Sequence, residues 1–558
     1  MRRRLRWARL RAYWLAPQGI VMLAATLLAL AIRVFTLTRP GYITGVTEYD
    51  DGVYLGGAIR LLQGALPYQN WAFVQPPGIL LLMSPVALIA KVGTATDAMA
   101  TARVLTALAS TACVPMAGSL LRYRGTFVTL VTCGALAIYP DDITTAHTLI
   151  LEPWMNLFLL LGACLAFRRG HLAFPQRLLW AGVAIGFAGA VKYWAALPAV
   201  ALLVLCVVTG PGAGRGAWHS ALRVRRAACY AGGVLAGFLV PVLPFALTAP
   251  SVFVRSTLFD QAARAGTSVP QSLRLAHITG LIDFLSSTGH LSLAAGVHSM
   301  FASGGAAATS TTGAGWLPFA VALVGVGVIA IGYCWNAGRM SPLEWFALVS
   351  AALAIAAVLS YSAFFYHYPD FAAPWLALTV GAVAGSLAHA VAEWTRAQRV
   401  VIAGTGVVIL ALAVFQASEV SGLRAPNISA DAAAIPAGAC LVTDQTSLAI
   451  AADRFTAARP GCPDIMDSLA ATLVLSDGVS VQGGAADLPD VVAAWKKTFS
   501  EAQYVWLSPN NARRIPWTPA LQLWFITHFQ VLQSPGPDGL GDVYEQVSLT
   551  GTGPAQSG

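Results

Sequence analysis

Residues 19–32 read GIVMLAATLLALAI, and the apolar run continues to Leu37 with Arg33 as its single charged interruption. An α-helix of roughly 20 apolar residues is long enough to span the hydrocarbon of a bilayer. A second run of this kind covers residues 316–333. Because both runs are continuously apolar and do not alternate between apolar and polar residues, they predict membrane-spanning helices and not the strands of a barrel.

The whole chain has the composition of a multi-pass membrane protein. Of its 558 residues 57% are hydrophobic, and the mean hydropathy of +0.66 exceeds what a soluble domain of this size can hide in a core. The net charge of +9 comes largely from Lys and Arg in short segments between apolar runs, a distribution that orients membrane proteins. The charge therefore indicates a lipid bilayer and no nucleic acid partner. We expect a cytoplasmic (inner) membrane protein with a cytoplasmic N-terminus.

The apolar runs predict an all-α membrane domain over residues 1–419, with about 11 spans. Its two long outer loops are expected at 38–96 and 249–315. The expected spans are 19–37, 97–121, 126–139, 152–167, 178–194, 195–208, 227–247, 316–334, 343–361, 370–390 and 400–418.

Two helices are expected to lie in the membrane interface within the first outer loop. Residues 52–63 have an amphipathic pattern of helical period, and residues 78–90 form a short apolar stretch that contains proline. Counting the second stretch as a span would place Arg122 and Arg124 outside, against the positive-inside trend. The charge distribution therefore favours an interfacial position.

Beyond residue 420 the composition becomes more polar, and a small extracytoplasmic α/β domain is expected over 420–558. Its alternating segments predict strands and its helical patterns predict helices, at 440–443, 504–507, 468–475 and 490–499. Cys440 and Cys462 stand apart from the other six cysteines, which lie in or beside apolar runs without metal-ligand spacing. In an oxidising compartment these two are candidates for one disulfide.

The sequence TEYDDGVY, residues 47–54, concentrates three carboxylates in a chain with only 11% charged residues. Asp50 or Asp51 could simply cap the following helix. A cap does not explain Glu48, Asp50 and Asp51 together, because their mutual repulsion must be offset by a cation or a hydrogen-bond donor. One of them could instead deprotonate an acceptor hydroxyl during sugar transfer. The residues alone leave both interpretations open, and a divalent cation near Asp50 remains possible, although no His/Cys ligand set is evident there.

The order of motifs in this loop resembles a known family. The order is an acidic pair, a tyrosine, an amphipathic helix, Gly-x-x-x-Tyr and then x-Pro-Pro-Gly. It is similar to the first outer loop of the GT-C membrane glycosyltransferases, and closest to the branch of protein O-mannosyltransferases and aminoarabinose transferases. The resemblance implies a GT-C fold in which Asp50 is the base, Asp51 is the second acid and Tyr54 takes the tyrosine position. Gln75 stands where aminoarabinose transferases carry lysine. The chain therefore departs from the family pattern at a position where a contact to the phosphate would be expected.

Two later residues extend the resemblance. Glu152, in Leu-Ile-Leu-Glu-Pro, is similar to the family's acidic residue at the outer mouth of the fourth span, although a glutamate at a helix N-terminus is also favoured by the helix dipole. Lys192 ends a small-residue helix like the family's lysine, where a cation would hold the phosphate of a lipid donor. On the residues alone, a lysine that snorkels to the interface is the simpler interpretation.

Further candidates lie at the expected outer ends of helices. Arg255, Arg264 and Arg274 oppose the positive-inside trend. They could neutralise lipid phosphates of the outer leaflet, or Arg264 with Arg255 could hold the donor phosphate, which is the interpretation we prefer. His367 lies between two tyrosines, which is typical of an aromatic belt, with sugar contact as the alternative. Two other features are expected to face solvent or the interface: Arg33 is expected to snorkel, and at least one of Asp141 and Asp142 to be solvated.

Together these features predict a glycosyltransferase that moves a mannose- or arabinose-type sugar from a polyprenyl-phosphate donor to a hydroxyl of a cell-envelope glycan, glycolipid or protein. Two other classes stay open. A transporter or flippase of envelope precursors would place its ionisable residues at the bilayer midplane. A non-catalytic envelope assembly protein would use the C-terminal domain and tolerate loss of Asp50 and Glu152.

Overall fold

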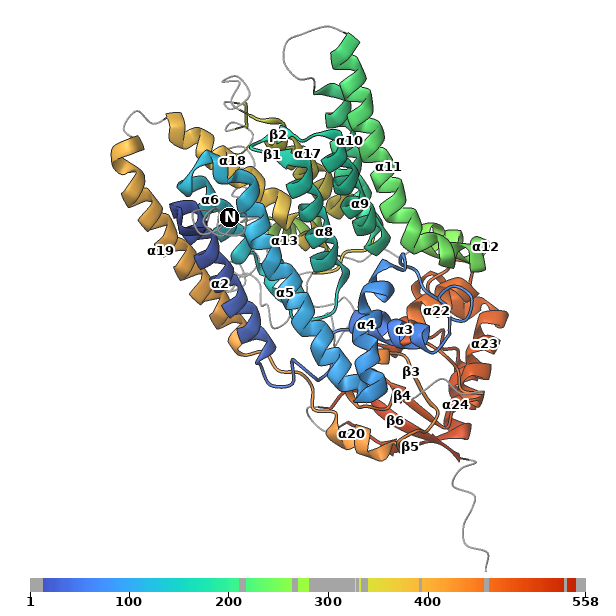
Figure 1. The fold of residues 1–558 in the computed structure, drawn as a ribbon. Helices are drawn as coiled ribbons and strands as arrows, with labels where there is room; N and C mark the ends of the chain where they lie inside the picture. The colour runs from blue at the N-terminus through green and yellow to red at the C-terminus, as the bar shows by residue number, and fades with distance from the viewer. Residues whose placement is uncertain are drawn as a thin grey trace, which may run out of the picture.

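The computed structural model describes residues 14–209, 217–262, 269–280, 327, 331–332, 340–390, 394–455, 461–535 and 539–547 (Figure 1). The chain is mostly helical, and five of the described helices are long and apolar enough to cross a membrane. These are α2 (Pro17–Leu37), α5 (Ala95–Leu121), α11 (Ala217–Thr248), α17 (Pro342–Ser360) and α19 (Trp394–Ser421). The prediction of a helical membrane protein is therefore confirmed.

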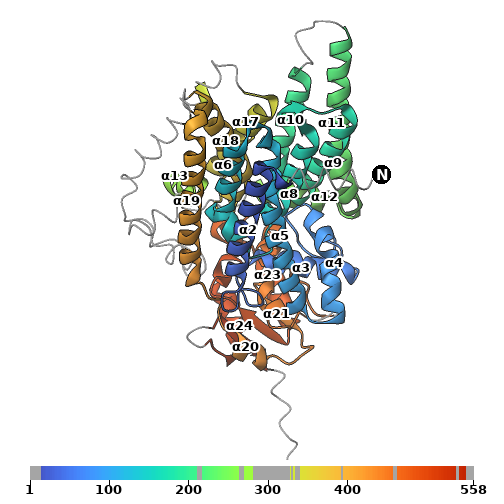
Figure 2. The ribbon, with the colours of Figure 1, turned by 60° about the vertical axis from the view of Figure 1, so that its left-hand side comes forward.

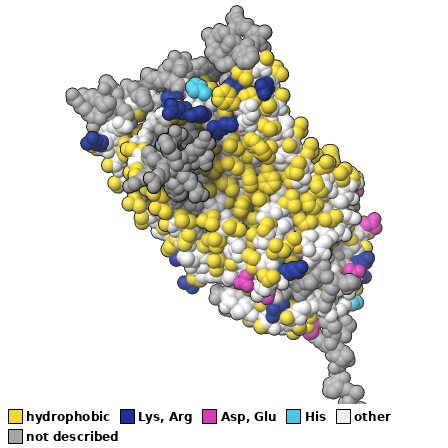
Figure 3. All heavy atoms as spheres, in the orientation of Figure 1, with side chains coloured by type: hydrophobic (Ala, Val, Ile, Leu, Met, Phe, Trp, Pro, Cys, Tyr) yellow, Lys and Arg dark blue, Asp and Glu magenta, His cyan; other side chains and the backbone are white. Residues whose placement is uncertain are grey.

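Shorter apolar helices pack among the long ones. They are α6 (Thr126–Ala137), α8 (Leu151–Ala166), α9 (Pro175–Val191), α10 (Ala196–Val208) and α18 (Ala373–Ala390). Within the described residues a helix stands at every position where the sequence predicts a span, whereas the span expected at 316–334 lies largely outside them. Figure 3 shows apolar side chains gathered over these helices, as expected for a surface that faces lipid.

Helices α9 and α11 approach each other at backbone distance. Each carries two glycines four residues apart, and these glycines face the backbone of the opposite helix. A Cβ atom at Gly186 would lie 2.1 Å from the carbonyl oxygen of Val234, and one at Gly237 would lie 2.1 Å from that of Val183. Only glycine permits this packing, which is typical of helix pairs in membranes. This close packing holds the C-terminal end of α9 in place, and Lys192 is the next residue.

Residues 422–547, here called the C-terminal segment, hold a four-stranded sheet in the order β3 (Leu441–Thr443), β4 (Tyr504–Leu507), β6 (Asp542–Gln546), β5 (Phe529–Gln533). Strand β3 is parallel to β4, and the other neighbours are antiparallel. Cys440 and Cys462 form a disulfide, which is the pairing expected from the sequence. The helices of this segment are α20 (Ser429–Ala434), α21 (Thr446–Ala451), α22 (Ser468–Leu475), α23 (Pro489–Ser500) and α24 (Pro519–His528).

The C-terminal segment covers one end of the membrane helices (Figures 1 and 2). There it packs on α3 (Asp50–Leu62), which lies beside α4 (Gly78–Val92). The prediction of an amphipathic helix at 52–63 is wrong in one respect. Helix α3 is buried continuously from Asp51 to Arg60 and not on one face only. The reason is that the C-terminal segment covers α3 as well: a Cβ atom at Gly52 would meet Ser447 of α21, and Arg60 pairs with Asp464.

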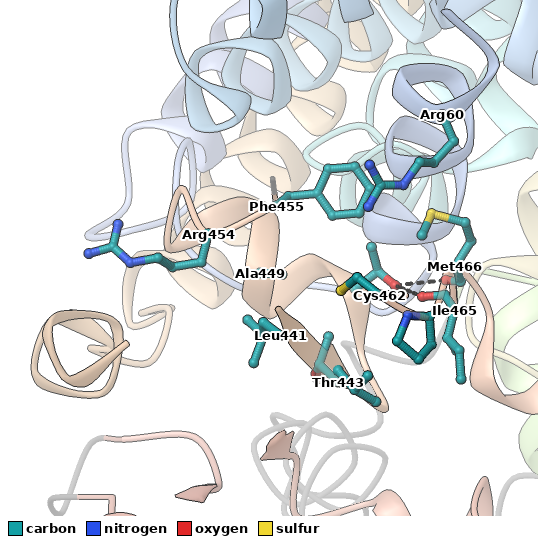
Figure 4. Close-up of a pocket in the computed structure, with 12 residues that line it drawn as sticks. Arg60, Leu441, Thr443, Ala449, Arg454, Phe455, Cys462, Ile465 and Met466 are labelled. Atoms are coloured by element: carbon teal, nitrogen blue, oxygen red, sulfur yellow. Dashed lines mark hydrogen bonds between the residues drawn. The ribbon is translucent and has the colours of Figure 1, made fainter. Parts of the chain in front are cut away.

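A small pocket marks the contact between α3 and the C-terminal segment (Figure 4). The Arg60 guanidinium on α3 pairs with Asp464, at 2.6 Å from Nε to Oδ1, and lies over the Phe455 ring at 4.4 Å. Close by, Tyr49 Oη donates to Asp467 Oδ1 at 2.8 Å. Residues 47–54, here called the acidic loop, and the C-terminal segment therefore form one packed unit.

Gly52→Ala is expected to weaken this contact. The added Cβ would lie 2.0 Å from the backbone nitrogen of Ser447, and a backbone atom cannot move away as a side chain can. Overpacking of this kind costs about 1–3 kcal/mol. The melting temperature in detergent should therefore fall, whereas Gly406→Ala, where a Cβ meets no atom within 4 Å, should leave it unchanged. An unchanged melting temperature of Gly52→Ala would contradict the described interface.

Candidate functional site

The segment between α17 and α18 brings the two candidate acidic regions together. Tyr366 Oη donates to Glu48 Oε2 at 2.8 Å, and the Nδ1 atom of the next residue, His367, lies 2.9 Å from Glu152 Oε1. Glu48 belongs to the acidic loop, and Glu152 lies in the first turn of α8. Both acidic regions are thus at the end of the helices that the C-terminal segment covers.

Asp50 is the first residue of α3 and is half-buried. Tyr54, one turn further along the same helix, donates its hydroxyl to Asp50 Oδ2 at 3.1 Å. The Tyr54 ring is 3% exposed, so its hydroxyl is held in place. A carboxylate at a helix N-terminus is also stabilised by the helix dipole. Asp50 is therefore a positioned carboxylate, which general-base chemistry requires.

Asp51 has a different environment from its neighbour. It is fully buried, forms an ion pair with Arg103 of α5, and also accepts hydrogen bonds from the Thr148 hydroxyl and, at 2.6 Å, from the Leu149 backbone nitrogen. Arg103 supplies the positive charge that the crowded carboxylates need. Because both oxygens of Asp51 are already hydrogen-bonded, this residue is suited to anchoring the acidic loop and not to taking a proton.

Glu152, Lys192 and His367 form the second cluster. The Lys192 ammonium pairs with the same Glu152 oxygen that contacts His367, and it lies 4.3 Å from the centre of the Tyr368 ring and 4.6 Å from that of Trp194. Such cation–π contacts add to the fixation of a buried cation. Lys192 is 6% exposed, so the interpretation as a snorkelling lysine is wrong. The second oxygen of Glu152, Oε2, is buried and has no hydrogen-bond partner among the described residues.

Two sequence expectations nearby are also wrong. Asp141 and Asp142, of which at least one was expected to be solvated, are each 3% exposed. Arg33, expected to snorkel, is fully buried in an ion pair with Asp142, which also accepts from Ser110 Oγ at 2.7 Å. Asp141 pairs instead with His277 Nδ1 at 3.0 Å. A buried ion pair therefore ties α2 to the segment that precedes α8, and the Ser110 hydroxyl ties α5 to the same aspartate.

The remaining candidates make contacts of their own or lie outside the described residues. Arg255 is partly exposed and pairs with Asp477 of the C-terminal segment, with Asp260 at 3.8 Å. Arg274 is 4% exposed and donates to backbone carbonyls, including that of Tyr361 at 2.6 Å, so it does not face lipid phosphates. The backbone oxygen of Gln75 accepts from Tyr68 Oη at 2.5 Å. Arg264 lies outside the described residues.

No group of three His, Cys, Asp or Glu side chains gathers at metal-binding distance within the described ranges. Near Asp50 the charge of the neighbouring Asp51 is balanced by Arg103. The residues at this point are thus arranged as ion pairs and hydrogen bonds, and they do not form a recognisable metal-ligand set.

No family model matches the chain, and no curated protein matches it by sequence. Solved structures do resemble it. ArnT from Cupriavidus metallidurans bound to undecaprenyl phosphate has a TM-score of 0.56 at 15% identity, over 94% of this chain and 97% of that one. The Archaeoglobus fulgidus oligosaccharyltransferase AglB, in complex with an inhibitory peptide and a dolichol-phosphate, has a TM-score of 0.53 at 14% identity, over 95% of this chain and 74% of that one. Likeness at these identities shows a shared fold.

Proposed function

Given that the chain has the GT-C glycosyltransferase fold, we propose that it transfers a sugar from a polyprenyl-phosphate carrier to a hydroxyl group on the extracytoplasmic side of the inner membrane. The observation that carries this proposal is the juxtaposition of Glu48 and Glu152 through the adjacent residues Tyr366 and His367. It brings the acidic loop and a buried lysine to one end of the helices. A transporter would place its ionisable groups at the bilayer midplane and would not need this pairing.

In the proposed reaction the acceptor oxygen bonds to the anomeric carbon of the sugar while the bond from that carbon to the phosphate oxygen breaks. Asp50 takes the proton of the acceptor hydroxyl, and the polyprenyl phosphate leaves as an anion. Lys192 is the cation that we assign to that anion, and a cation in a water-poor site stabilises developing charge more strongly than one in bulk water. Glu152 holds Lys192 through Oε1 and offers Oε2 to a sugar hydroxyl.

The carrier class follows from topology. Nucleotide sugars are cytosolic, so a transferase with its carboxylates on the opposite side needs a donor that has already crossed the membrane. Undecaprenyl phosphate and dolichol-phosphate, bound by the two similar structures, are of this class. The proposed division is a membrane domain over 1–419 and an extracytoplasmic domain over 420–558, and the Cys440–Cys462 disulfide suits an oxidising compartment.

The finer assignments are part of the same proposal. The sugar is of mannose or arabinose type, and the acceptor is a hydroxyl of an envelope glycan, glycolipid or protein. Arg255 and Arg264 are proposed to assist Lys192 at the phosphate. Tyr54, Gln75 and His367 are proposed to line the substrate site, because Tyr54 contacts Asp50 and His367 contacts Glu152.

The donor class can be tested with the purified protein in proteoliposomes. Radiolabelled mannose and arabinose are supplied in two forms, on polyprenyl phosphate and on a nucleotide, together with an envelope extract as acceptor. We expect label to enter the acceptor only from the lipid-linked form. Transfer from the nucleotide form alone, or movement of labelled lipid between leaflets without transfer, would contradict the proposed function.

A further inference from the structure

The proposed reaction assigns no role to Glu48, a third carboxylate of the acidic loop. Its Oε1 accepts from the backbone nitrogen of Tyr49 at 2.9 Å, and its Oε2 accepts from Tyr366 Oη at 2.8 Å. Each oxygen thus has a donor, one from its own loop and one from the segment between α17 and α18. Neither donor is a cation, and among the described residues Glu48 has no ion pair of the kind that Asp51 and Glu152 each have.

The charges that face Glu48 come from two segments. Asp50 lies two residues further along its own chain, and His367 approaches from the segment that also carries Tyr366. Burial and the charge of Asp50 raise the pKa of Glu48 to about 7, against the smaller opposing effects of His367 and of the two hydrogen bonds. Glu48 therefore changes its protonation state close to neutral pH.

We propose that Glu48 is a positioning residue that sets the strength of Asp50 as a base. In its charged form, held by Tyr366, it keeps a negative charge beside Asp50, and a like charge nearby increases the affinity of a carboxylate for a proton. In its neutral form that charge is lost, which weakens Asp50 as a proton acceptor. This inference rests on the proposed function, because it concerns the same transfer step.

The sign of the pH effect follows directly. Glu48 loses its proton as the pH rises through about 7, so the wild-type turnover number should rise with pH across that value. Glu48→Gln cannot become charged, and it should lose this rise and have a turnover number lower by up to about tenfold at pH 8, which is the most that roughly one unit in the pKa of the base can give. Tyr366→Phe removes a bond that lowers the pKa of Glu48, so it should move the rise to higher pH.

The experiment is a pH–rate profile of the full-length protein in proteoliposomes from pH 5 to 9, with saturating lipid-linked donor. Glu501→Gln, the same chemical change in a partly exposed glutamate of the C-terminal segment, serves as matched control and should retain the wild-type profile. The KM for the donor should stay the same in all variants, because Glu48 acts through Asp50.

The outcomes separate this inference from the proposed function. If the wild type transfers no sugar at any pH, the proposed function fails. If the wild type transfers sugar and Glu48→Gln retains the rise near pH 7, only the role of Glu48 is overturned. If Glu48→Gln does not fold, Tyr366→Phe decides, since an unshifted profile in that variant contradicts the inference.

Discussion

Asp50→Asn is expected to reduce sugar transfer by about 10²–10⁴-fold, the contribution of a general base in enzymes of many kinds. Asparagine has the same shape as aspartate and its side-chain oxygen can still accept from Tyr54 Oη, so the fold should be retained. The amide cannot take up the proton of an acceptor hydroxyl. Transfer of label from a polyprenyl-phosphate sugar, measured in proteoliposomes, checks this result.

The neighbouring Asp51→Asn provides the contrast. This change leaves Arg103 buried without its charged partner, and the loss of one member of a buried ion pair typically costs 3–5 kcal/mol. Its main effect should therefore be a lower melting temperature. If Asp51→Asn were stable but inactive while Asp50→Asn remained active, the assignment of base and anchor would be reversed.

The second large effect is expected at the pair of Glu152 and Lys192. Lys192→Met removes the cation that we assign to the leaving phosphate and should lower transfer by several hundredfold, the effect of removing one preorganised stabilising group. It also leaves Glu152 buried without its charged partner, so the protein should lose stability as well. Activity and stability are therefore confounded in the single variant.

The double variant Glu152→Gln with Lys192→Met separates them. Neither residue then carries a charge, so the melting temperature should recover toward that of the wild type, because no uncompensated buried charge remains. Transfer should stay lost, since the phosphate still lacks its cation. Both quantities are measured on the same preparations, by thermal unfolding in detergent and by label transfer. Recovery of transfer together with stability would show that the pair is structural only.

Much of the helical fold could be predicted from the sequence because a membrane helix is a local pattern. The apolar run at 19–32 and the segment rich in small residues before Lys192 both lie within helices close to the predicted positions. The sequence also contains a signal for the close contact between α9 and α11. Gly182 and Gly186 on α9, with Gly233 and Gly237 on α11, have the small-xxx-small spacing of closely packed helices, so this helix pair could have been found.

The ion pairs could not be found in the same way. Arg33 and Asp142 are 109 residues apart and Arg103 and Asp51 are 52 apart, and nothing in the local pattern of either partner identifies the other. An isolated arginine or lysine in an apolar run therefore looked like a snorkelling side chain. The continuous burial of α3 was missed for the same reason, because its cover comes from the C-terminal segment.

The candidate site was predicted in part. Asp50, Glu152 and Lys192 were singled out through family resemblance, and the structure shows the contacts that each of them makes. Tyr366 is one of the two tyrosines beside His367 and was given no role, and its hydrogen bond to Glu48 depends on a turn that the sequence does not identify. The segment between α17 and α18 has no periodic pattern, so its position between the two acidic regions became apparent only from the fold.

The central claim is that a carboxylate at position 50 drives transfer from a lipid-linked sugar. The most direct measurement compares the wild type and Asp50→Asn for two quantities in the same proteoliposomes: binding of labelled polyprenyl-phosphate sugar, and its transfer to the acceptor. We predict equal binding in both proteins and transfer by the wild type only. Equal transfer by both proteins, or binding without transfer by the wild type across the mannose and arabinose donors, would contradict the account.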